Sequence, residues 1–412
     1  MLTVAYIANQ FPSPVEPYVW EEIAELRSRG VRVIACSVRR PKALLDGSSQ
    51  TWEEETLYLP PFHFSVLLRA AWTCLREFPR LVALVHLLER ESPPGRIRAL
   101  LHTWLGAYYA LVLTGRGVRH IHAHHGYSAS WIAMVAARLL GISFSMTLHG
   151  SDLLLHHAYL RTKLTNCKFC LTVSEFNRSH IREHYPAIPT SKVALCRLGV
   201  GAPQMDLYGE AKPARAPLLM LSVGRLHPVK DHAFLIRACS QLKRNGVRFT
   251  CLIAGDGPER PSLNRLIAQL QLRDEVRLLG HLSRRRLEAY YAMCDLVVLT
   301  SRSEGLPLVL MEAMAHGKTV LAPAITGIPE LVIDGKTGFA YQPGSIADFA
   351  FRVRTIAELH PALTPVREAA RQHVLQNFNR ERNLAFFADL FLTRVLARDG
   401  VLRNEDPVLQ QI

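Results

Sequence analysis

Short apolar runs and longer helical patterns alternate along the chain. The short runs are rich in Val, Ile and Leu and are typical of buried strands, while the longer segments carry apolar residues at helical spacing. In the first half, the strand-like runs are 3–8, 31–38, 118–125, 142–150 and 167–174. In the second half, they are 218–224, 249–255, 275–280, 294–300 and 319–323. This alternation predicts an α/β protein with parallel, doubly wound sheets covered by helices.

A break in this pattern separates the two halves. Gly, Pro, Ala and Lys replace the periodic residues at 199–217, where Pro213 and Pro217 bracket the expected hinge. The 412 residues also exceed the roughly 250 to 300 at which one core stops growing. The predicted division is residues 1–205, a linker at 206–217, residues 218–378 and a terminal segment at 379–412. Because open parallel sheets bind ligands beyond the carboxyl ends of their strands, two such Rossmann-like domains facing each other would form a deep cleft.

Three further patterns bear on the ends of the chain and on membranes. Leu384, Phe387, Leu390 and Phe391 recur at helical spacing and predict a final helix at about 380–402. The first residues lack a basic leader and a small-residue cleavage site, so we interpret them as a strand and not as a signal peptide. The longest apolar stretch, 99–113, falls short of the roughly 18 to 20 residues that span a bilayer. We expect a cytoplasmic protein whose membrane association is at most peripheral.

The chain is strongly basic. Its 49 Lys and Arg against 35 Asp and Glu give a net charge of 49 − 35 = +14. Residues 1–215 carry 24 basic and 16 acidic residues (+8), and the rest carry 25 and 19 (+6), so no basic tail holds the excess. The basic clusters at 39–42 and 284–286 lack the interleaved aromatic residues of a nucleic-acid groove. The charge therefore indicates an anionic partner other than nucleic acid.

Cysteine and histidine patterns give little support for a metal. Eight cysteines are scattered, and the single C-x-x-C pair, Cys167 and Cys170, has no second pair with which to form a zinc site. His120, His122 and His124 share one face of a strand, but no carboxylate or cysteine lies near them in the sequence. The chain has no Asp-x-Asp motif, which commonly holds a divalent ion against a nucleotide diphosphate. We therefore expect neither metal nor cofactor, and anticipate that protein cations neutralise any bound diphosphate.

Two nucleotide motifs fail in detail. The Gly-Lys-Thr triplets at 317–319 and 335–337 have Glu312 and Glu330 where a P-loop requires Gly. The run from Gly255 to Arg260 has Arg at the third glycine position of a dinucleotide fingerprint. Nucleotide hydrolysis and a dinucleotide cofactor are thus disfavoured.

The segment SRSEGLPLVLMEAM, residues 301–314, carries two glutamates eight positions apart, Glu304 and Glu312. Such a pair also arises by chance, and Ser301 with Glu304 resembles a helix capping box. Gly305 and the following Pro instead predict a strand, a loop holding Glu304, and a helix that begins near Leu306 with its free N–H groups at the strand-end edge. Carboxylates there could accept hydrogen bonds from the hydroxyls of a sugar and a ribose.

A cationic element follows the first strand of the second half. Gly224 allows close backbone approach, and Arg225 and Lys230 could clamp a diphosphate and stabilise its charge as it leaves. Gly255 and Gly280 end the next two strand-like runs and complete the expected donor site. On its own, a Gly-Arg pair also fits an ordinary surface.

In the first half, a polar turn follows the run FSMTL. His149 could contact the reacting sugar or the acceptor, although Asp152 in the same turn could simply cap a helix. We place His149 and Asp152, together with His124 and Glu16, on the acceptor side of the site.

Taken together, several motifs identify a family resemblance. The segments HIHAHHGYSASWIAMVAARLLGISFSMTLHGSD, SVGRLHPVKD, LIAGDGPER, VRLLGHLS, SRSEGLPLVLMEAMAHG and TGIPELVIDGKTGF resemble family-4 glycosyltransferases of the two-domain GT-B fold. The resemblance implies a metal-independent, retaining transfer of a hexose from a nucleotide sugar. It also implies that Glu304 and Glu312 contact the donor sugar and ribose, that Arg225 and Lys230 hold the diphosphate, and that the final helix crosses back to the first domain.

Within that family, the opening FPSPVEPYVWEEIAEL is similar to enzymes that build bacterial exopolysaccharide, colanic-acid-like or lipopolysaccharide chains, with Pro12, Glu16 and Val19 in a similar pattern. Two positions differ from the family pattern. Residues 13–16 replace the Gly-Gly loop of many relatives, and Thr326 stands where a Gly is common. The resemblance implies a saccharide or lipid-linked saccharide acceptor and is compatible with an anionic membrane surface as a partner. A sugar-nucleotide epimerase, a phosphorylase and a non-catalytic sugar-nucleotide-binding protein remain alternatives.

Overall fold

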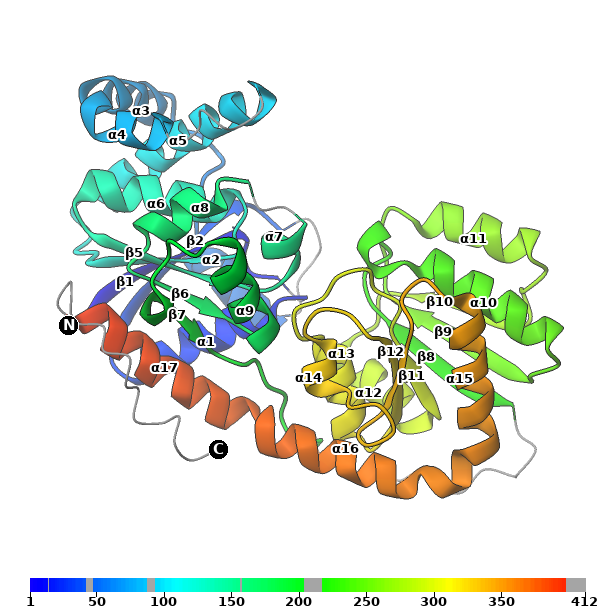
Figure 1. Ribbon diagram of the computed structural model, residues 1–412. Helices are drawn as coiled ribbons and strands as arrows, with labels where there is room; N and C mark the ends of the chain where they lie inside the picture. Colours follow the sequence, from blue (N-terminus) through cyan, green and yellow to red (C-terminus); the bar gives the residue numbers. More distant parts are fainter. Residues whose placement is uncertain (14, 42–46, 87–92, 156–157, 204–216, 398–412) are drawn as a thin grey trace. The chain divides into compact units, whose positions relative to one another are not determined.

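The computed structural model describes residues 1–13, 15–41, 47–86, 93–155, 158–203 and 217–397 (Figure 1). The chain forms two compact units. The first contains Met1–Arg197 and the chain from Leu384 onward, and the second contains Leu198–Asn383. Except for Pro217, the predicted linker at 206–217 lies outside the described residues.

The first unit is built on a parallel sheet of seven described strands in the order β3-β2-β1-β4-β5-β6-β7. The strands are β1 (Thr3–Gln10), β2 (Arg32–Arg39), β3 (Leu57–Tyr58), β4 (His120–His124), β5 (Ser143–Leu148), β6 (Phe169–Thr172) and β7 (Val193–Leu195). Val4 of β1 pairs with Val33 on one side and with His120 on the other. The strand order therefore reverses between β1 and β4, which is the usual ligand-binding point of a doubly wound sheet.

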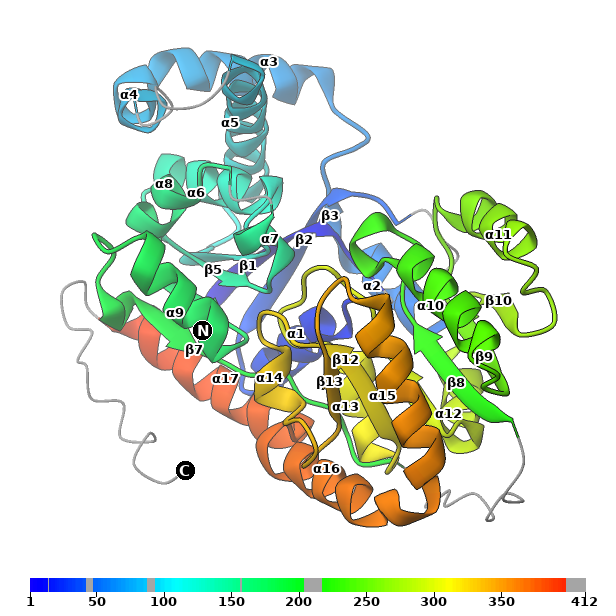
Figure 2. The same ribbon diagram turned by 45° about the vertical axis from the view of Figure 1, so that its right-hand side comes forward.

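Helices cover both faces of this sheet (Figure 2). They are α1 (Pro17–Ser28), α2 (Gly47–Glu55), α3 (Phe64–Arg76), α4 (Phe78–His86), α5 (Pro93–Leu113), α6 (Ser128–Leu140), α7 (Ser151–Leu154), α8 (Leu160–Asn166) and α9 (Glu175–His184). α5 packs closely on the buried helix α6, because a Cβ at Gly106 would lie 2.6 Å from Cβ of Val135. The Trp131 indole of α6 donates a 3.0 Å hydrogen bond to Thr103 Oγ1 of α5. The apolar stretch 99–113 is therefore largely a helix of the protein core.

The terminal helix α17 (Arg380–Leu396) confirms the helix predicted from the apolar spacing. From Leu384 onward it belongs to the first unit, as the family resemblance implied. Phe387 and Phe391 are buried. The Phe391 ring lies 5.2 Å from that of His122 and 5.8 Å from that of Phe169, both on the sheet. The helix ends at Leu396, and residues 398–402, the last five predicted for it, lie outside the described residues.

The second unit contains a parallel sheet of six described strands in the order β10-β9-β8-β11-β12-β13. They are β8 (Leu218–Val223), β9 (Phe249–Ala254), β10 (Val276–Gly280), β11 (Leu296–Val298), β12 (Thr319–Pro323) and β13 (Phe339–Tyr341). The covering helices are α10 (His232–Arg244), α11 (Arg260–Gln269), α12 (Arg284–Met293), α13 (Leu308–Ala315), α14 (Ile328–Leu331), α15 (Ile346–Leu359) and α16 (Thr364–Asn377). Here the order reverses between β8 and β11. The prediction of two doubly wound α/β domains is thus confirmed.

Among the described residues, no helix combines the length and the apolar character needed to cross a membrane.

Candidate functional site

The second unit brings Lys230 and Glu304 into direct contact. Lys230 ends a short 3-10 turn (Pro228–Lys230) after β8, and Glu304 lies in the loop between β11 and α13. The Lys230 ammonium lies 2.5 Å from Oε1 of Glu304, and the Ser301 hydroxyl donates to the same oxygen at 2.6 Å. Both charged side chains are partly exposed, so each can exchange its partner for a ligand. The sequence had placed these two residues in one site, and the fold brings them together.

The loop before α13 is fixed by its backbone. The Thr326 hydroxyl donates a 2.5 Å hydrogen bond to the main-chain carbonyl of Glu304. Gly305 and Leu306 are buried, and the helix begins at Leu308 instead of near Leu306 as predicted. The difference follows from Pro307, which has an extended backbone and forms the N-cap.

Three glycines bring the ends of the neighbouring strands together at this edge. Gly224 follows β8, Gly255 follows β9, and Gly280 ends β10. The N–H of Gly224 donates to Ala254 O at 2.9 Å, and that of Gly255 donates to Gly280 O at 2.8 Å. A Cβ at Gly255 would lie only 1.9 Å from Gly224 O, so no other residue fits without a backbone shift. The predicted glycines thus form one continuous backbone wall.

Arg225 follows Gly224 directly, and its side chain is exposed. An exposed guanidinium beside the glycine wall can bind a phosphate in bidentate fashion. The sequence had paired Arg225 with Lys230, and the structure places the two on either side of one short loop that begins at the end of β8.

Glu312 lies on α13, about one turn beyond the helix start at Leu308. It accepts a 2.9 Å hydrogen bond from the Tyr291 hydroxyl of α12. Burial and the neighbouring Glu312 raise the pKa of the Tyr291 phenol well above its usual value, so the phenol remains a donor. Tyr291 is therefore a positioning residue for Glu312 that the sequence patterns did not reveal.

His232 is a second residue that the sequence reading missed. It starts α10 and is only 2% exposed, and neither of its ring nitrogens has a hydrogen-bond partner within the described structure. A Cβ at Gly224 would lie 3.8 Å from its Nε2, so the ring lies close behind the glycine wall. Burial, followed by the charge of Lys230, lowers the pKa of His232 to about 4. The sequence did contain a signal for His232: it is a histidine at the start of a helix whose buried face is otherwise apolar.

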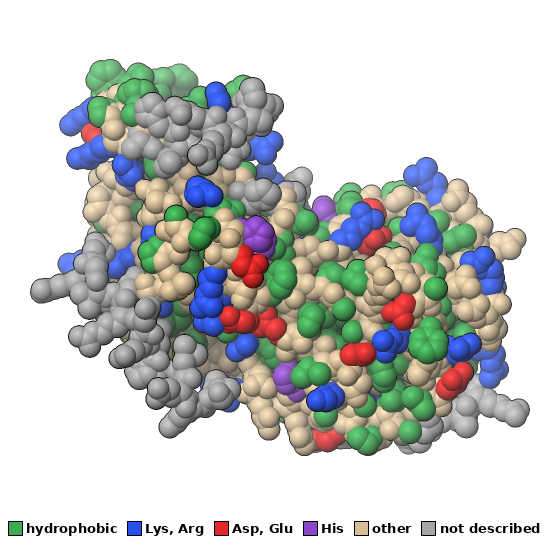
Figure 3. Space-filling view, in the orientation of Figure 1, with side chains coloured by type: hydrophobic (Ala, Val, Ile, Leu, Met, Phe, Trp, Pro, Cys, Tyr) green, Lys and Arg blue, Asp and Glu red, His purple; other side chains and the backbone are tan. Residues whose placement is uncertain are grey.

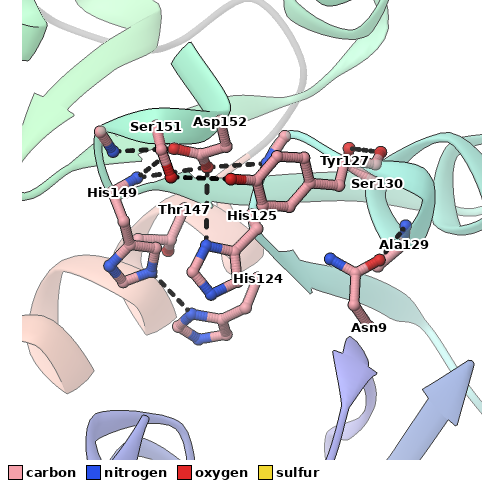
Figure 4. Close-up of polar contacts among 12 residues, drawn as sticks. Asn9, His124, His125, Tyr127, Ala129, Ser130, Thr147, His149, Ser151 and Asp152 are labelled. Atoms are coloured by element: carbon pink, nitrogen blue, oxygen red, sulfur yellow. Dashed lines mark hydrogen bonds and ion pairs between the residues drawn. The ribbon is translucent and has the colours of Figure 1, made fainter. Parts of the chain in front are cut away.

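In the first unit, a chain of hydrogen bonds connects the interior to the turn after β5 (Figure 4). His149 Nε2 lies 3.1 Å from His124 Nδ1, and His124 Nε2 lies 2.8 Å from Oε2 of Glu22. The same carboxylate oxygen accepts a 2.7 Å hydrogen bond from the Tyr6 hydroxyl. His124 and Glu22 are buried, whereas His149 is partly exposed.

This arrangement selects a tautomer for His149. A carboxylate only accepts hydrogen bonds, so Nε2 of His124 is the donor to Glu22. With His124 in its neutral form, Nδ1 is then an acceptor and the Nε2–H of His149 donates to it, whereas a protonated His124 would donate from Nδ1 to His149. His149 stays neutral, because burial and the neighbouring histidines lower its pKa well below the usual value. Its Nδ1 is consequently left as a hydrogen-bond acceptor.

Asp152 holds the turn that carries His149. Its Oδ1 accepts from Gly150 N at 2.8 Å and from His149 N at 3.1 Å, while its Oδ2 accepts from Gly126 N at 2.8 Å. The carboxylate is fully buried and joins the ends of β4 and β5. Asp152 therefore acts by fixing the backbone of the turn. The side chain of this turn that is available to a ligand is that of His149.

Glu16, placed on the acceptor side by the sequence, lies beside the histidine group. Its Oε1 is 3.3 Å from His125 Nε2. The Tyr18 ring stacks on His149 with centroids 4.5 Å apart and planes at 27°, which limits the rotation of the imidazole. Asn9, just before the end of β1, accepts hydrogen bonds from Ser128 Oγ at 2.8 Å and Ala129 N at 3.1 Å and so caps α6 (Figure 4).

The histidines of β4 need a correction. The expectation that no carboxylate lies near them is wrong, because α1 places Glu22 beside His122 and His124, with ligand atoms of all three within 4.8 Å. Such a set could hold a metal ion. In the structure, however, these atoms bond to one another and to hydroxyls: His122 Nδ1 lies 2.7 Å from Ser145 Oγ, and His122 Nε2 lies 3.0 Å from Thr147 Oγ1. The geometry is that of a satisfied polar network.

Sequence comparison resolves the family. Residues 15–201 match the model of Glycosyltransferase Family 4, and residues 210–373 match that of Glycosyl transferases group 1. The chain therefore carries a family-4 glycosyltransferase domain followed by a group 1 glycosyltransferase domain. The first match covers the first unit from α1 to the end of β7, and the second covers all described strands of the second unit. All site residues described above except Tyr6 and Asn9 of β1 lie within the two matches.

Relatives of this chain include a protein named for colanic acid biosynthesis and another named as a glycosyltransferase. The colanic acid biosynthesis glycosyltransferase WcaL of Salmonella typhimurium is 36% identical over 200 residues, 47% of this chain and 49% of that protein. The glycosyltransferase EpsF of Bacillus subtilis is 28% identical over 294 residues, 66% of this chain and 74% of that protein. In the match to WcaL, the chain spans about half the length of its relative.

Solved structures show the same fold at low sequence identity. HepE of Anabaena, crystallised with UDP and glucose, has a TM-score of 0.68 at 19% identity, covering 95% of this chain and 100% of that one. The lipopolysaccharide outer core galactosyltransferase WaaB has a TM-score of 0.67 at 16% identity, covering 95% and 100%. The fold is therefore GT-B, as the resemblance implied.

Proposed function

We propose that the chain is a retaining, metal-independent glycosyltransferase that moves a hexose from a nucleotide sugar to a saccharide acceptor in bacterial exopolysaccharide or lipopolysaccharide synthesis. The names of WcaL and WaaB support the pathway class. The HepE complexes with UDP and with UDP-glucose support a nucleotide-sugar donor.

The observation that carries this proposal is the Lys230–Glu304 pair beside the glycine wall. A donor diphosphate would take Lys230 from Glu304, and the released carboxylate would accept hydrogen bonds from sugar hydroxyls. The exposed Arg225 adds a second cation at the same strand end. Two cations next to approachable backbone at the start of α10 suit an anion of the charge of a nucleoside diphosphate.

The proposed reaction breaks the bond between C1 of the hexose and the phosphate oxygen. The acceptor hydroxyl attacks C1 from the same face, and its proton passes to the departing phosphate oxygen. A new C1–oxygen bond forms on that face, so the anomeric configuration is retained. Lys230 and Arg225 stabilise the charge that grows on the leaving diphosphate, a contribution of about 3 kcal/mol per donor in comparable sites.

The first unit supplies the acceptor side in this proposal. His149, fixed in the Nε2–H form by His124, would offer Nδ1 as an acceptor to a sugar hydroxyl. Tyr18 and Asp152 would keep that imidazole in place, the first by stacking and the second through the turn. Glu16 beside His125 adds a carboxylate that can accept further hydroxyl hydrogen bonds.

Metal independence follows in this proposal from the two cations, which take the role that a divalent ion has in other nucleotide-sugar enzymes. Transfer should persist after treatment with EDTA and should not rise when Mg²⁺ or Mn²⁺ is added. Loss of transfer on chelation, with recovery on adding one metal, would overturn this part of the proposal.

The test of function is a panel of nucleotide sugars and saccharide acceptors analysed by mass spectrometry. The donor that raises the Tm should also yield an acceptor heavier by one hexose. Isomerised donor without a new glycoside would indicate an epimerase, and sugar 1-phosphate formed from a saccharide and phosphate would indicate a phosphorylase. Thermal stabilisation without any product would indicate a binding protein.

For the location, we propose the cytoplasm and the inner face of the cell membrane, where nucleotide sugars and lipid-linked acceptors meet. Fractionation of cells should recover the chain in the cytosol and on inner membranes. Recovery in the periplasm would contradict this location.

A further inference from the structure

Exposed apolar side chains are concentrated on one helical layer of the first unit. Half of the 18 exposed large hydrophobic side chains in the described structure lie between residues 62 and 101, on and around α3, α4 and α5. They are Phe62, Phe64, Leu68, Trp72, Leu75, Phe78, Ile97, Leu100 and Leu101. Figure 3 shows hydrophobic side chains gathered over this end of the unit, and we call these nine side chains the apolar surface.

Helix α3 has two separate apolar faces. Val66, Leu67, Ala70 and Cys74 face the core and pack around α5. Phe64, Leu68, Trp72 and Leu75 are 74%, 57%, 67% and 70% exposed. Their spacing of four, four and three residues places them in one stripe on the other side of the helix. The outer stripe therefore contributes nothing to the core and is available to a partner.

The start of α5 continues the surface. Ile97, Leu100 and Leu101 are 70%, 55% and 49% exposed, at the spacing of one helix face. The same helix buries Ala99 on its opposite side. α3 and α5 are held together by the Trp104 indole, which donates a 3.1 Å hydrogen bond to Leu67 O. The apolar surface is thus presented by packed helices.

Among the described residues of this helical layer, the charges are mostly positive. Residues 59–86 and 93–113 contain five arginines, all exposed, and one acidic residue. The arginines are Arg69, Arg76, Arg80, Arg96 and Arg98. The acidic residue, Glu77, is itself paired with Arg80 at 3.2 Å. Helical geometry places Arg69 and Arg76 along one edge of the outer stripe of α3.

We propose that the apolar surface docks on the surface of an anionic lipid bilayer. Trp, Phe and Leu on one face with Arg at the edge form the pattern of a helix that lies in the membrane interface. The arginines would meet lipid phosphates while the apolar side chains enter the acyl boundary. A second copy of the chain is the less suitable occupant, because a symmetric contact would bring the arginines of the two copies together.

The apolar surface could dock on a membrane whatever the chain does, but the benefit of docking to catalysis rests on the proposed function. A lipid-linked acceptor is confined to the membrane, so an enzyme held there meets it in two dimensions instead of three. The net charge of +8 of residues 1–215 would also attract this part of the chain to an anionic membrane.

Co-sedimentation with vesicles tests the docking. The intact chain should bind vesicles that contain phosphatidylglycerol, bind pure phosphatidylcholine vesicles more weakly, and lose part of its binding at high salt. Trp72→Glu combined with Leu75→Glu should weaken binding at least about tenfold. Because both side chains are largely exposed, the Tm should stay close to that of the wild type, which shows that the variant folds.

The matched control places the same charges elsewhere. Phe351→Glu combined with Leu359→Glu changes two side chains of α15 that are 54% and 45% exposed, and it should bind vesicles like the wild type. Arg69→Gln combined with Arg98→Gln should reduce binding to anionic vesicles only.

Several outcomes would overturn the docking proposal. They are a wild type that binds neither kind of vesicle, equal binding by the Trp72→Glu, Leu75→Glu variant, and a wild-type dimer that this variant separates into monomers without any lipid binding. Transfer to a water-soluble acceptor separates the two proposals: transfer without vesicle binding overturns only the docking, and vesicle binding without transfer overturns only the proposed function.

Discussion

Lys230 and Glu304 lie 74 positions apart in the sequence, yet their ammonium and carboxylate groups are 2.5 Å apart at the carboxyl edge of the second sheet. Each is thereby held in position and kept partly neutralised before a ligand arrives. An anionic donor that displaces Glu304 from Lys230 exchanges one ion pair for another. Folding has already removed part of the water around the lysine, so donor binding requires less desolvation of Lys230.

Replacing Lys230 by Ala should lower kcat by about 100-fold, because one cation at the departing diphosphate is lost. Lys230→Arg should recover part of that loss, since the charge remains but its geometry differs. Lys243→Ala is the control: Lys243, near the end of α10, pairs with Glu275 just before β10, and its removal should leave kcat unchanged. Steady-state transfer kinetics measure all three, and wild-type kcat in Lys230→Ala would contradict the assignment.

Replacing Glu312 by Ala should raise the donor KM or Kd about tenfold, because an acceptor for ribose hydroxyls is lost. Tyr291→Phe should have a smaller effect in the same direction, since it removes the 2.9 Å hydrogen bond that orients Glu312 but leaves the carboxylate in place. Calorimetric titration with the donor measures both. An unchanged donor affinity in Glu312→Ala would exclude this carboxylate from the donor site.

Glu22→Gln should allow His149 to adopt both neutral tautomers instead of the Nε2–H form alone. An amide can donate as well as accept, so His124 Nε2 no longer has to be the donor, and transfer should fall about tenfold. The ¹⁵N chemical shifts of the imidazole nitrogens should show His149 in the Nε2–H form in the wild type and in a mixture in the variant.

Glu25→Gln is the control for Glu22→Gln on the same helix, because Glu25 only pairs with the partly exposed Arg29. It should change neither the imidazole spectrum nor the rate. A wild-type spectrum with the proton of His149 on Nδ1 would contradict the hydrogen-bond chain as described.

Gly255→Ala should destabilise the second unit by about 3 kcal/mol, since its Cβ would overlap the carbonyl of Gly224 at 1.9 Å. Gly246→Ala is the matched control: it also has a positive φ, but a Cβ there would meet nothing within 4 Å. Its cost should be about 1 kcal/mol. Urea unfolding measures both free energies of unfolding. Equal losses of stability in the two variants would show that the close contact with Gly224 O does not explain the need for glycine at position 255.

Stability should fall with pH through His232. The pKa of His232 is lowered to about 4 in the folded state, against an ordinary value of 6.5 for histidine. The unfolded chain therefore binds more protons between these values, and stability is lost as the pH falls from about 6.5 toward 4, by on the order of 3 kcal/mol. His232→Gln should flatten this pH dependence in urea unfolding. An unchanged slope would mean that other groups cause the acid sensitivity.

The strand pattern and the local motifs could be predicted from the sequence because they depend on neighbouring residues. The strands and the existence of helix α17 follow from periodicity, and the convergence of Lys230 with Glu304 follows from the rule that parallel strands end at one edge. The return of α17 to the first unit was implied only by the family resemblance. Helix α13 begins two residues later than predicted because Pro307 takes the cap position. Such a shift is decided by the backbone of one residue.

The hydrogen-bond chain in the first unit could not be predicted in the same way. Glu22 lies 102 positions from His124, and only the packing of α1 on the sheet brings them together. A signal was nevertheless present. Val19, Glu22, Ile23 and Leu26 share the buried face of α1, so Glu22 is an acidic residue in an apolar stripe. A charge at such a position requires a partner inside the protein.

The apolar surface could not be predicted from the sequence for a different reason. Leu68 and Trp72 have the spacing of core residues, and the sequence does not distinguish the outer stripe of α3 from its inner face. Only the exposure of the side chains in the fold reveals that one of the two faces is unused by the core.

The central claim is that Lys230 and Glu304 form the donor site of a retaining transferase. Its most direct test is NMR and mass analysis of the product formed from a stabilising nucleotide sugar and a saccharide acceptor, for the wild type and Lys230→Ala. The account predicts an acceptor carrying one added hexose with the anomeric configuration of the donor, formed about 100-fold more slowly by the variant. Inverted configuration, or equal rates for the two proteins, would contradict it.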